Sequence, residues 1–285
     1  MTRGLRFGLA AAGLCFAAAA QAQLQWQGEL GAGAEDFTSG APTWRQYDAA
    51  LRVRTPERLL GEVSVRRTDR YQAKDTEFGF AAVLPAGDWI GSAALTLSPT
   101  HEALPSWGVR LGAARVLADG WVVGLEASRQ LFDRADLVDT SIAGTERVVG
   151  SSAAMLNVER YVGAWRFAAG VGRVRLDGGE SGGTARLQID RFYADERGRV
   201  GAVLAGGQEF ENLPPTASRP SAIFSITSFT VALVGVHPLD AAWSLSWALS
   251  STRNGDIQAR YADGAITTGD SYHRNGVRLG VQRDF

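Results

Sequence analysis

Apolar and polar residues alternate along most of this chain, in runs of about ten residues that are separated by turn residues. In residues 243–250, for example, Trp243, Leu245, Trp247 and Leu249 alternate with three serines and an alanine. A period of two places successive side chains on opposite faces of a strand, and helical periodicity is weak throughout. The pattern therefore predicts an all-β protein whose strands each have one apolar and one polar face.

The runs and their connections predict a closed barrel. Bacterial outer-membrane barrels require an even number of strands, and about 14 runs follow residue 23. The connections are alternately short and long, as are the periplasmic turns and outer loops of such barrels, whereas a soluble sandwich has no reason to keep this asymmetry. We therefore predict a single transmembrane antiparallel β-barrel of about 14 strands, or of about 12 if weak runs such as residues 186–193 drop out as a pair.

The last run, residues 272–285, carries its apolar residues on one face: Val277, Leu279, Val281 and Phe285. An apolar strand with a terminal aromatic resembles the closing strand of bacterial outer-membrane barrels. In that class the closing strand is also the assembly signal, so the resemblance implies the barrel assembly machinery as a partner. Arg283 departs from such signals, which usually carry an apolar or aromatic residue there. From this stretch alone, an edge strand of a soluble sandwich remains an alternative.

Tryptophan is concentrated at the predicted starts of strands. Amphipathic aromatic side chains favour membrane–water interfaces, whereas a soluble core would not select strand starts so consistently. We expect a girdle at the periplasmic interface, completed by Phe285, from Trp26, Trp89, Trp121, Trp165 and Trp243. Two further tryptophans follow long loops and are expected at the opposite interface: Trp44 and Trp107.

The N-terminus has the features of a secretory signal peptide. Two arginines precede an apolar run, residues 7–20, which ends in an A-x-A cleavage site. We expect residues 1–22 to be the signal peptide and residues 23–285 to be the barrel domain. Cys15 would leave with the signal, and no later window of about 18 apolar residues could form a transmembrane helix. A chain that spans a membrane without such helices must do so as a closed barrel.

The overall charge is close to neutral, with 29 basic and 30 acidic residues, and no basic patch indicates a nucleic-acid partner. The charges fall instead on the polar faces of the strands, which point into the lumen of a barrel. Unpaired charges buried there would cost several kcal/mol each, so we expect them to be paired or bathed in water. The candidate lumen-lining residues are Arg52, Arg54, Glu62, Arg66, Glu77, Arg110, Glu126, Asp190 and Arg278.

This charged face has two interpretations that the sequence leaves open. It could form a polar conduit or a ligand-binding lumen, or it could be a network of ion pairs that fills a narrow barrel. The lumen width decides between them, and no sequence pattern gives that width.

The three histidines, His101, His237 and His273, belong to different ends of the predicted barrel, which argues against a metal cluster. We therefore predict no metal and no cofactor. Outer-membrane enzymes place a Ser-His or Asp-His pair near the outer rim. The candidates for such a pair are His101 with Ser98 or Glu102, and His273 near Asp270, against the plain interpretation of solvated loop histidines.

Three stretches together resemble the YaiO family of outer-membrane proteins. They are residues 98–105 continuing to Gly120 and Trp121, the E-R-Y hairpin at residues 159–165, and residues 237–243. The match is poorest at residues 134–150. The resemblance implies an outer-membrane barrel with a weak link to surface polysaccharide, and it carries no functional residue over to this chain.

Three functions are consistent with these observations. The first is a non-enzymatic barrel in the outer membrane, serving as a narrow channel or a surface-structural protein, with lipid and a polysaccharide or small solute as partners. The second is an enzyme that acts on lipid or glycan at the outer rim. The third is a soluble periplasmic β-protein that binds a ligand.

Overall fold

The computed structural model describes residues 24–40, 42–55, 60–70, 73–133, 148–177, 180–194, 196–213, 222–261 and 266–285. Within them, fifteen strands form one antiparallel sheet. The strands are β1 (Gln25–Phe37), β2 (Trp44–Arg54), β3 (Leu60–Arg70), β4 (Ala73–Ala86), β5 (Trp89–Leu97), β6 (Trp107–Val116), β7 (Trp121–Asp133), β8 (Val148–Val162), β9 (Trp165–Leu176), β10 (Ser181–Tyr193), β11 (Gly198–Leu213), β12 (Ala222–Pro238), β13 (Trp243–Tyr261), β14 (Ile266–Gly269) and β15 (Tyr272–Asp284).

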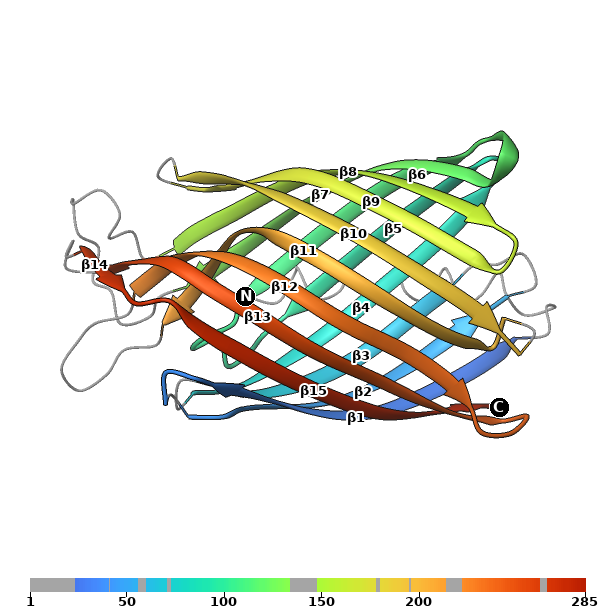
Figure 1. Ribbon diagram of the computed structural model, residues 1–285, viewed down its shortest axis with the longest axis horizontal. Coiled ribbons are helices and arrows are strands. Elements are labelled where there is room, and N and C mark those ends of the chain that lie inside the picture. Colours follow the sequence, from blue (N-terminus) through green and yellow to red (C-terminus); the bar gives the residue numbers. More distant parts are fainter. Residues whose placement is uncertain are drawn as a thin grey trace, which may run out of the picture.

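The sheet closes on itself (Figure 1). Each strand from β1 to β12 pairs with the next, β12 pairs with β13, β13 with β15, and β15 returns to β1. The four residues of β14 pair only with the far end of β13, so 14 strands form the wall. The predicted all-β barrel of 14 strands is confirmed, and the alternative of 12 is wrong because residues 186–193 belong to β10, which pairs along its length with β9 and β11.

A 3₁₀ turn at Ala118–Gly120 connects β6 to β7. Among the described residues there is no helix long and apolar enough to cross a membrane.

The outer face of the wall is apolar and exposed. Leu30, Leu125 and Leu279, on strands far apart in the sequence, are exposed by 70, 61 and 54 %. Several of the largest buried side chains are polar instead, among them Asn254, Asp75 and Asp190. This arrangement, with apolar side chains outside and polar side chains inside, is unfavourable in water and favourable in lipid. In a closed barrel the strands hydrogen-bond to one another all the way round, and the apolar side chains face hydrocarbon. The soluble sandwich and the soluble periplasmic protein are therefore wrong.

The two ends of the barrel differ (Figure 1). The C-terminus lies at the end with the short connections, such as Gly163, which carries a φ of 55° in the two-residue turn between β8 and β9. β14 lies at the opposite end. By the asymmetry of this class, the first end is periplasmic and the second is external.

Candidate functional site in the barrel interior

The first charged cluster of the inner face lies at the seam where the barrel closes. Glu29 on β1 is bonded to Arg52 on β2 at 2.8 Å and to Arg278 on β15 at 2.9 Å. Arg52 continues to Glu62 on β3 at 2.6 Å, and Arg278 continues to Asp48 on β2. The Glu29 side chain is only 5 % exposed, and it also accepts hydrogen bonds from Ser246 and Gln282. Four strands are thus linked through one buried carboxylate.

A glycine makes room for this seam cluster. Arg278 reaches Asp48 across the intervening strand β1, where Gly31 stands opposite Asp48. A Cβ at Gly31 would lie 2.7 Å from the Arg278 guanidinium and 2.8 Å from the Asp48 carboxylate. Glycine at this position therefore leaves room for the close approach of the two charges, which a larger residue would have to displace.

A second cluster occupies the inner face of β8 to β11. Asp190 is fully buried and bonded to Arg166 at 3.2 Å, with the Arg199 guanidinium at 3.9 Å. Arg166 also binds Glu159 at 3.0 Å, and Gln188 donates its amide to Asp190. Both clusters lie within a few residues of the periplasmic strand ends, so they brace that end of the wall.

The other candidate lumen-lining residues are more solvated. Arg110 and Glu126, on β6 and β7, are separated by 3.5 Å, and their side chains are 60 and 37 % exposed. Arg66 and Glu77 are separated by 3.4 Å on β3 and β4. Arg54 is the exposed last residue of β2.

Trp44 does not belong to the outer girdle, and that prediction is wrong. Its side chain is 7 % exposed and points to the inner face, between the guanidiniums of Arg70 and Arg274 at 5.4 and 5.3 Å from the ring. Phe37 packs against its edge at 4.6 Å. The sequence held the signal, because Trp44 shares the parity of Asp48 and Arg52 rather than that of the apolar residues of its strand.

Residues 98–106, which connect β5 to β6, are anchored to the inner face at the outer mouth. Asp75 on β4 accepts the backbone N–H groups of Glu102, Ala103 and Leu104 at 2.7 to 2.9 Å. Arg70 donates to the carbonyl of Ala103. Asp75 and Ala103 are both buried, so this loop is held by specific bonds.

A cavity of about 310 Å³ lies below this loop, between the seam strands and β3. Leu104 and Trp44 form part of its lining, together with polar groups such as Gln46 and Thr68. Its inner-face charged residues are four arginines and one carboxylate: Arg66, Arg70, Arg274, Arg278 and Glu35. Arg274 is 3.4 Å from Glu35. The cavity therefore offers many donors to a polar solute and is richer in cationic than in anionic groups.

One further ion pair stands at the external end and joins Arg129 of β7 to Asp177, which lies just beyond the last residue of β9. Asp177 follows β9 and receives both a guanidinium donation from Arg129 and the backbone N–H of Gly150. The hydrogen bonds from Arg129 stabilise the ionised carboxylate, so the pKa of Asp177 lies below its ordinary value.

The histidines do not converge on one site. His101 Nδ1 lies 2.9 Å from the carbonyl oxygen of Ser98, and its Nε2 lies 4.0 Å from Asp133. The Ser98 hydroxyl is buried, and none of the residues that the structure describes forms a hydrogen bond with it. His237 contacts Tyr193 near the periplasmic end, and the backbone N–H of His273 bonds to Thr38 at the external end. Among the described residues, no three His, Cys, Asp or Glu side chains are grouped so that they could hold a metal ion.

The remaining girdle tryptophans start strands at the expected ends: Trp26, Trp89, Trp121, Trp165 and Trp243 at the periplasmic end, and Trp107 at the external end. Phe285 is 69 % exposed at the periplasmic rim. Val277, Leu279 and Val281 face outward on β15, which pairs with β1 to close the barrel. The expected role of β15 as an assembly signal stays a prediction, as does the signal peptide, which lies outside the described residues.

Sequence reasoning missed Glu29, Asp75, Glu159 and Arg166, which hold the clusters together. All four lie on the polar parity of their strands, so parity could have proposed them as inward-facing. Parity could not show which of them are buried, since burial depends on neighbours contributed by distant strands.

No family model and no curated protein matches this chain. Its fold does match solved structures. It is similar to the CymD monoaromatic hydrocarbon channel at 9 % identity and a TM-score of 0.56, covering 93 % of this chain and 89 % of that one. It is also similar to an anion-selective porin from Comamonas acidovorans, at 9 % identity and a TM-score of 0.48, covering 93 % of this chain and 100 % of that one. A bacterial polysaccharide outer membrane secretin is similar at 10 % identity and a TM-score of 0.49, covering 91 % of this chain and 98 % of that one.

The likeness is one of fold. Together with the apolar outer face and the girdles, it makes the chain an outer-membrane β-barrel protein.

Proposed function

We propose that this protein is a narrow, non-enzymatic outer-membrane channel for small polar solutes, with a preference for anions. The observation that supports this function is the cavity under residues 98–106, where four arginines and a single carboxylate reach the inner face. Charged side chains that line a constriction select ions because they replace part of the hydration shell that an ion loses there.

The preference for anions is expected to be moderate. Arg66 contacts Glu77, Arg274 contacts Glu35, and Arg278 is bonded to two carboxylates. These partners weaken the positive field, but each guanidinium has five N–H donors and retains some for a solute. A short acidic saccharide would satisfy both the positive charge and the N–H donors of the cavity. The resemblance to the YaiO family, with its weak link to surface polysaccharide, supports a solute of this kind.

The non-enzymatic character is part of the same proposal. An outer-rim hydrolase would require His101 to face a nucleophile, and here His101 contacts the carbonyl of Ser98 rather than its hydroxyl. Asp133 lies 4.0 Å away, on the other side of the imidazole. The alanine variants of His101 and His273 are accordingly expected to leave conductance and folding unchanged.

Single-channel recording of the refolded protein in a planar bilayer tests this function. We expect small, steady openings and a reversal potential in a KCl gradient that indicates preference for chloride. Arg66→Gln should reduce that preference, because it removes a half-exposed charge from the cavity lining. Arg115→Gln, on the lipid face, is the matched control and should leave the reversal potential unchanged.

A second variant tests the role of the anchored loop at the outer mouth. Asp75→Ala removes the acceptor that holds three backbone N–H groups of residues 102–104, so the loop should loosen and conductance should rise. A folded but silent wild-type protein would contradict the channel and favour a surface-structural role. A chloride preference that survives Arg66→Gln would show that this cavity does not set selectivity.

A further inference from the structure

Arginine and tryptophan form a repeated pair at the periplasmic rim of the outer face. In each pair the tryptophan starts a strand, and the arginine is its direct cross-strand partner, with the guanidinium carbon 4.9 to 5.7 Å from the centre of the indole ring. The pairs are Trp89 with Arg115, Trp121 with Arg160, Trp165 with Arg191, and Trp243 with Arg283. A pair that recurs in the same register on four hairpins indicates a shared role.

Arg283 shows that the pair extends to the closing strand. Its guanidinium lies 5.1 Å from the ring of Trp243 and 5.0 Å from that of Phe285. An arginine that departs from the usual apolar pattern of a terminal strand is thus accommodated by two aromatic faces.

Each of these guanidiniums is a charged group on the outer face of the wall. All four arginines are exposed, and among the described residues none of them makes an ion pair with a carboxylate. Stacking on a ring occupies the flat face of a guanidinium and leaves its N–H donors at the edge. At the level of an aromatic girdle, the anions available in a membrane are the phosphates of lipid headgroups, which arginine binds with two parallel hydrogen bonds.

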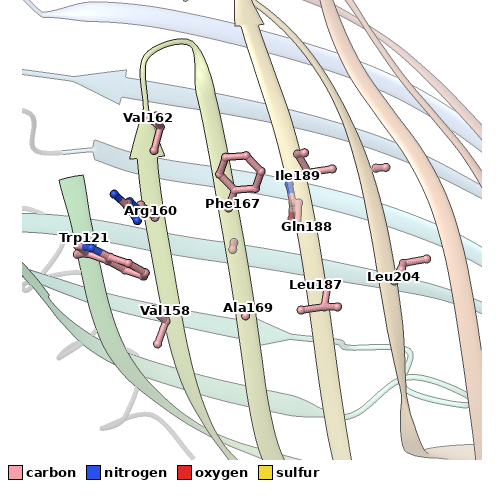
Figure 2. A pocket seen from close by; sticks show the side chains of 12 residues that line it. Trp121, Val158, Arg160, Val162, Phe167, Ala169, Leu187, Gln188, Ile189 and Leu204 are labelled. Atoms are coloured by element: carbon pink, nitrogen blue, oxygen red, sulfur yellow. The ribbon is translucent and has the colours of Figure 1, made fainter. Parts of the chain in front are cut away.

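One of the four pairs stands beside an apolar groove (Figure 2). The groove has a volume of about 670 Å³ and runs over the outer face of β8 to β11, with Trp121 and Arg160 on neighbouring strands at one side. Small side chains and larger apolar side chains alternate across it: Val158, Phe167, Ala169, Leu187, Ala202 and Leu204. It lies on the lipid-facing side of the wall, where acyl chains pack in a bilayer.

We propose that this face binds one glycerophospholipid, with an acyl chain in the groove and the phosphate on the guanidinium of Arg160. The groove supplies the apolar contact and Arg160 supplies the charge, so the ligand must carry both an acyl chain and an anionic phosphate. The site lies on the outer face, so it is independent of the proposed channel function.

Native mass spectrometry of the detergent-solubilised protein tests the site, with dioleoyl phosphatidylglycerol as the probe. We expect one molecule to bind more tightly than the rest, and Arg160→Gln to weaken that binding about tenfold through loss of a charge-assisted contact. Arg115→Gln is the matched control, since it removes the same kind of stacked pair away from the groove and should leave the tight site intact. Dioleoylglycerol, which lacks the phosphate, should not occupy the site.

A groove variant separates the two halves of the site. Ala169→Leu should fill the groove and weaken phosphatidylglycerol binding while Arg160 stays in place, and the mobility of the unboiled protein on a gel verifies that each variant is folded. Equal losses in Arg160→Gln and Arg115→Gln would mean that only the general charge of the rim attracts lipid, and would overturn the proposal. Equal binding of dioleoylglycerol, or unchanged binding in Ala169→Leu, would overturn it as well.

Discussion

The barrel interior holds charge in two different ways. At the seam, Glu29 is almost inaccessible and accepts hydrogen bonds from two arginines, a serine and a glutamine that come from three other strands. On the opposite part of the wall, Arg110 and Glu126 are separated by 3.5 Å, and both are open to water. Both regions follow the same sequence pattern, in which a charge alternates with apolar residues.

The same alternation of charged and apolar residues can therefore produce either a buried ion-pair network that stabilises the wall or a solvated lining of the lumen. A buried carboxylate must be fully compensated, because an unpaired charge in a dry environment is costly, and breaking its network is therefore strongly destabilising. A solvated pair is screened by water and contributes little to stability, but its charge acts on passing ions. The seam cluster thus supports the fold, and the solvated pairs are available for selectivity.

The largest expected effect comes from removing the centre of the seam cluster. Glu29→Gln should lower the free energy of unfolding by about 3–5 kcal/mol, because it removes the buried negative charge that two partly exposed guanidiniums share. Glu126→Gln, the matched change at the solvated pair, should cost less than about 1 kcal/mol. Equilibrium unfolding in guanidinium chloride, with the protein in detergent micelles, measures both values. Similar losses for the two variants would show that the two regions do not differ as described.

A smaller effect is expected from closing the space that the seam cluster uses. Gly31→Ala places a Cβ where the Arg278 guanidinium and the Asp48 carboxylate meet, and it should cost about 1–3 kcal/mol by forcing that bond apart. Gly183→Ala on β10 is the control, since its nearest neighbour would be a backbone oxygen at 4.0 Å. The same unfolding experiment applies, and a neutral Gly31→Ala variant would show that the cluster can rearrange around the added methyl group.

The smallest expected effect concerns the ion pair between Arg129 and Asp177, whose carboxylate lies just beyond the end of β9. Because the folded-state pKa of Asp177 is lowered, its contribution to stability is present above the unfolded pKa of about 3.9 and is lost as the pH falls through the lower folded value. The exposed pair should be worth less than about 1 kcal/mol at pH 7. The stability difference between wild type and Asp177→Asn should therefore shrink when unfolding is measured below pH 4 instead of at pH 7. A difference that stays constant over this range would contradict the assignment.

Much of the fold could be predicted because alternation along a strand is a local property. The parity of residues such as Leu279 and Arg278 follows directly from the sequence, as does the position of each girdle tryptophan at a strand start. The place of Trp44 after a loop predicts a position in the girdle, whereas its parity predicts the inner face. Where the two signals disagree, parity decides, because a side chain cannot change faces without shifting the register of the whole strand.

The candidate site was less accessible to prediction. Asp75 holds residues 102–104 in the outer mouth through bonds between segments nearly thirty residues apart, and no local pattern encodes them. The pairing of Arg283 with Trp243 also depends on the register between β13 and β15, which neither strand's own pattern gives.

The sequence by itself determined that this protein is an all-β barrel with an apolar outer face and a charged inner one, because strand periodicity and turn placement are local. Only the tertiary structure decided which of the inner charged side chains are buried and which are solvated, and where the cavity and the outer groove lie. The reason is that closure brings β1 and β15 together and sets side chains from several strands around each carboxylate. Burial, and with it the strength of every charge interaction, is a property of that assembled surface and not of any single strand.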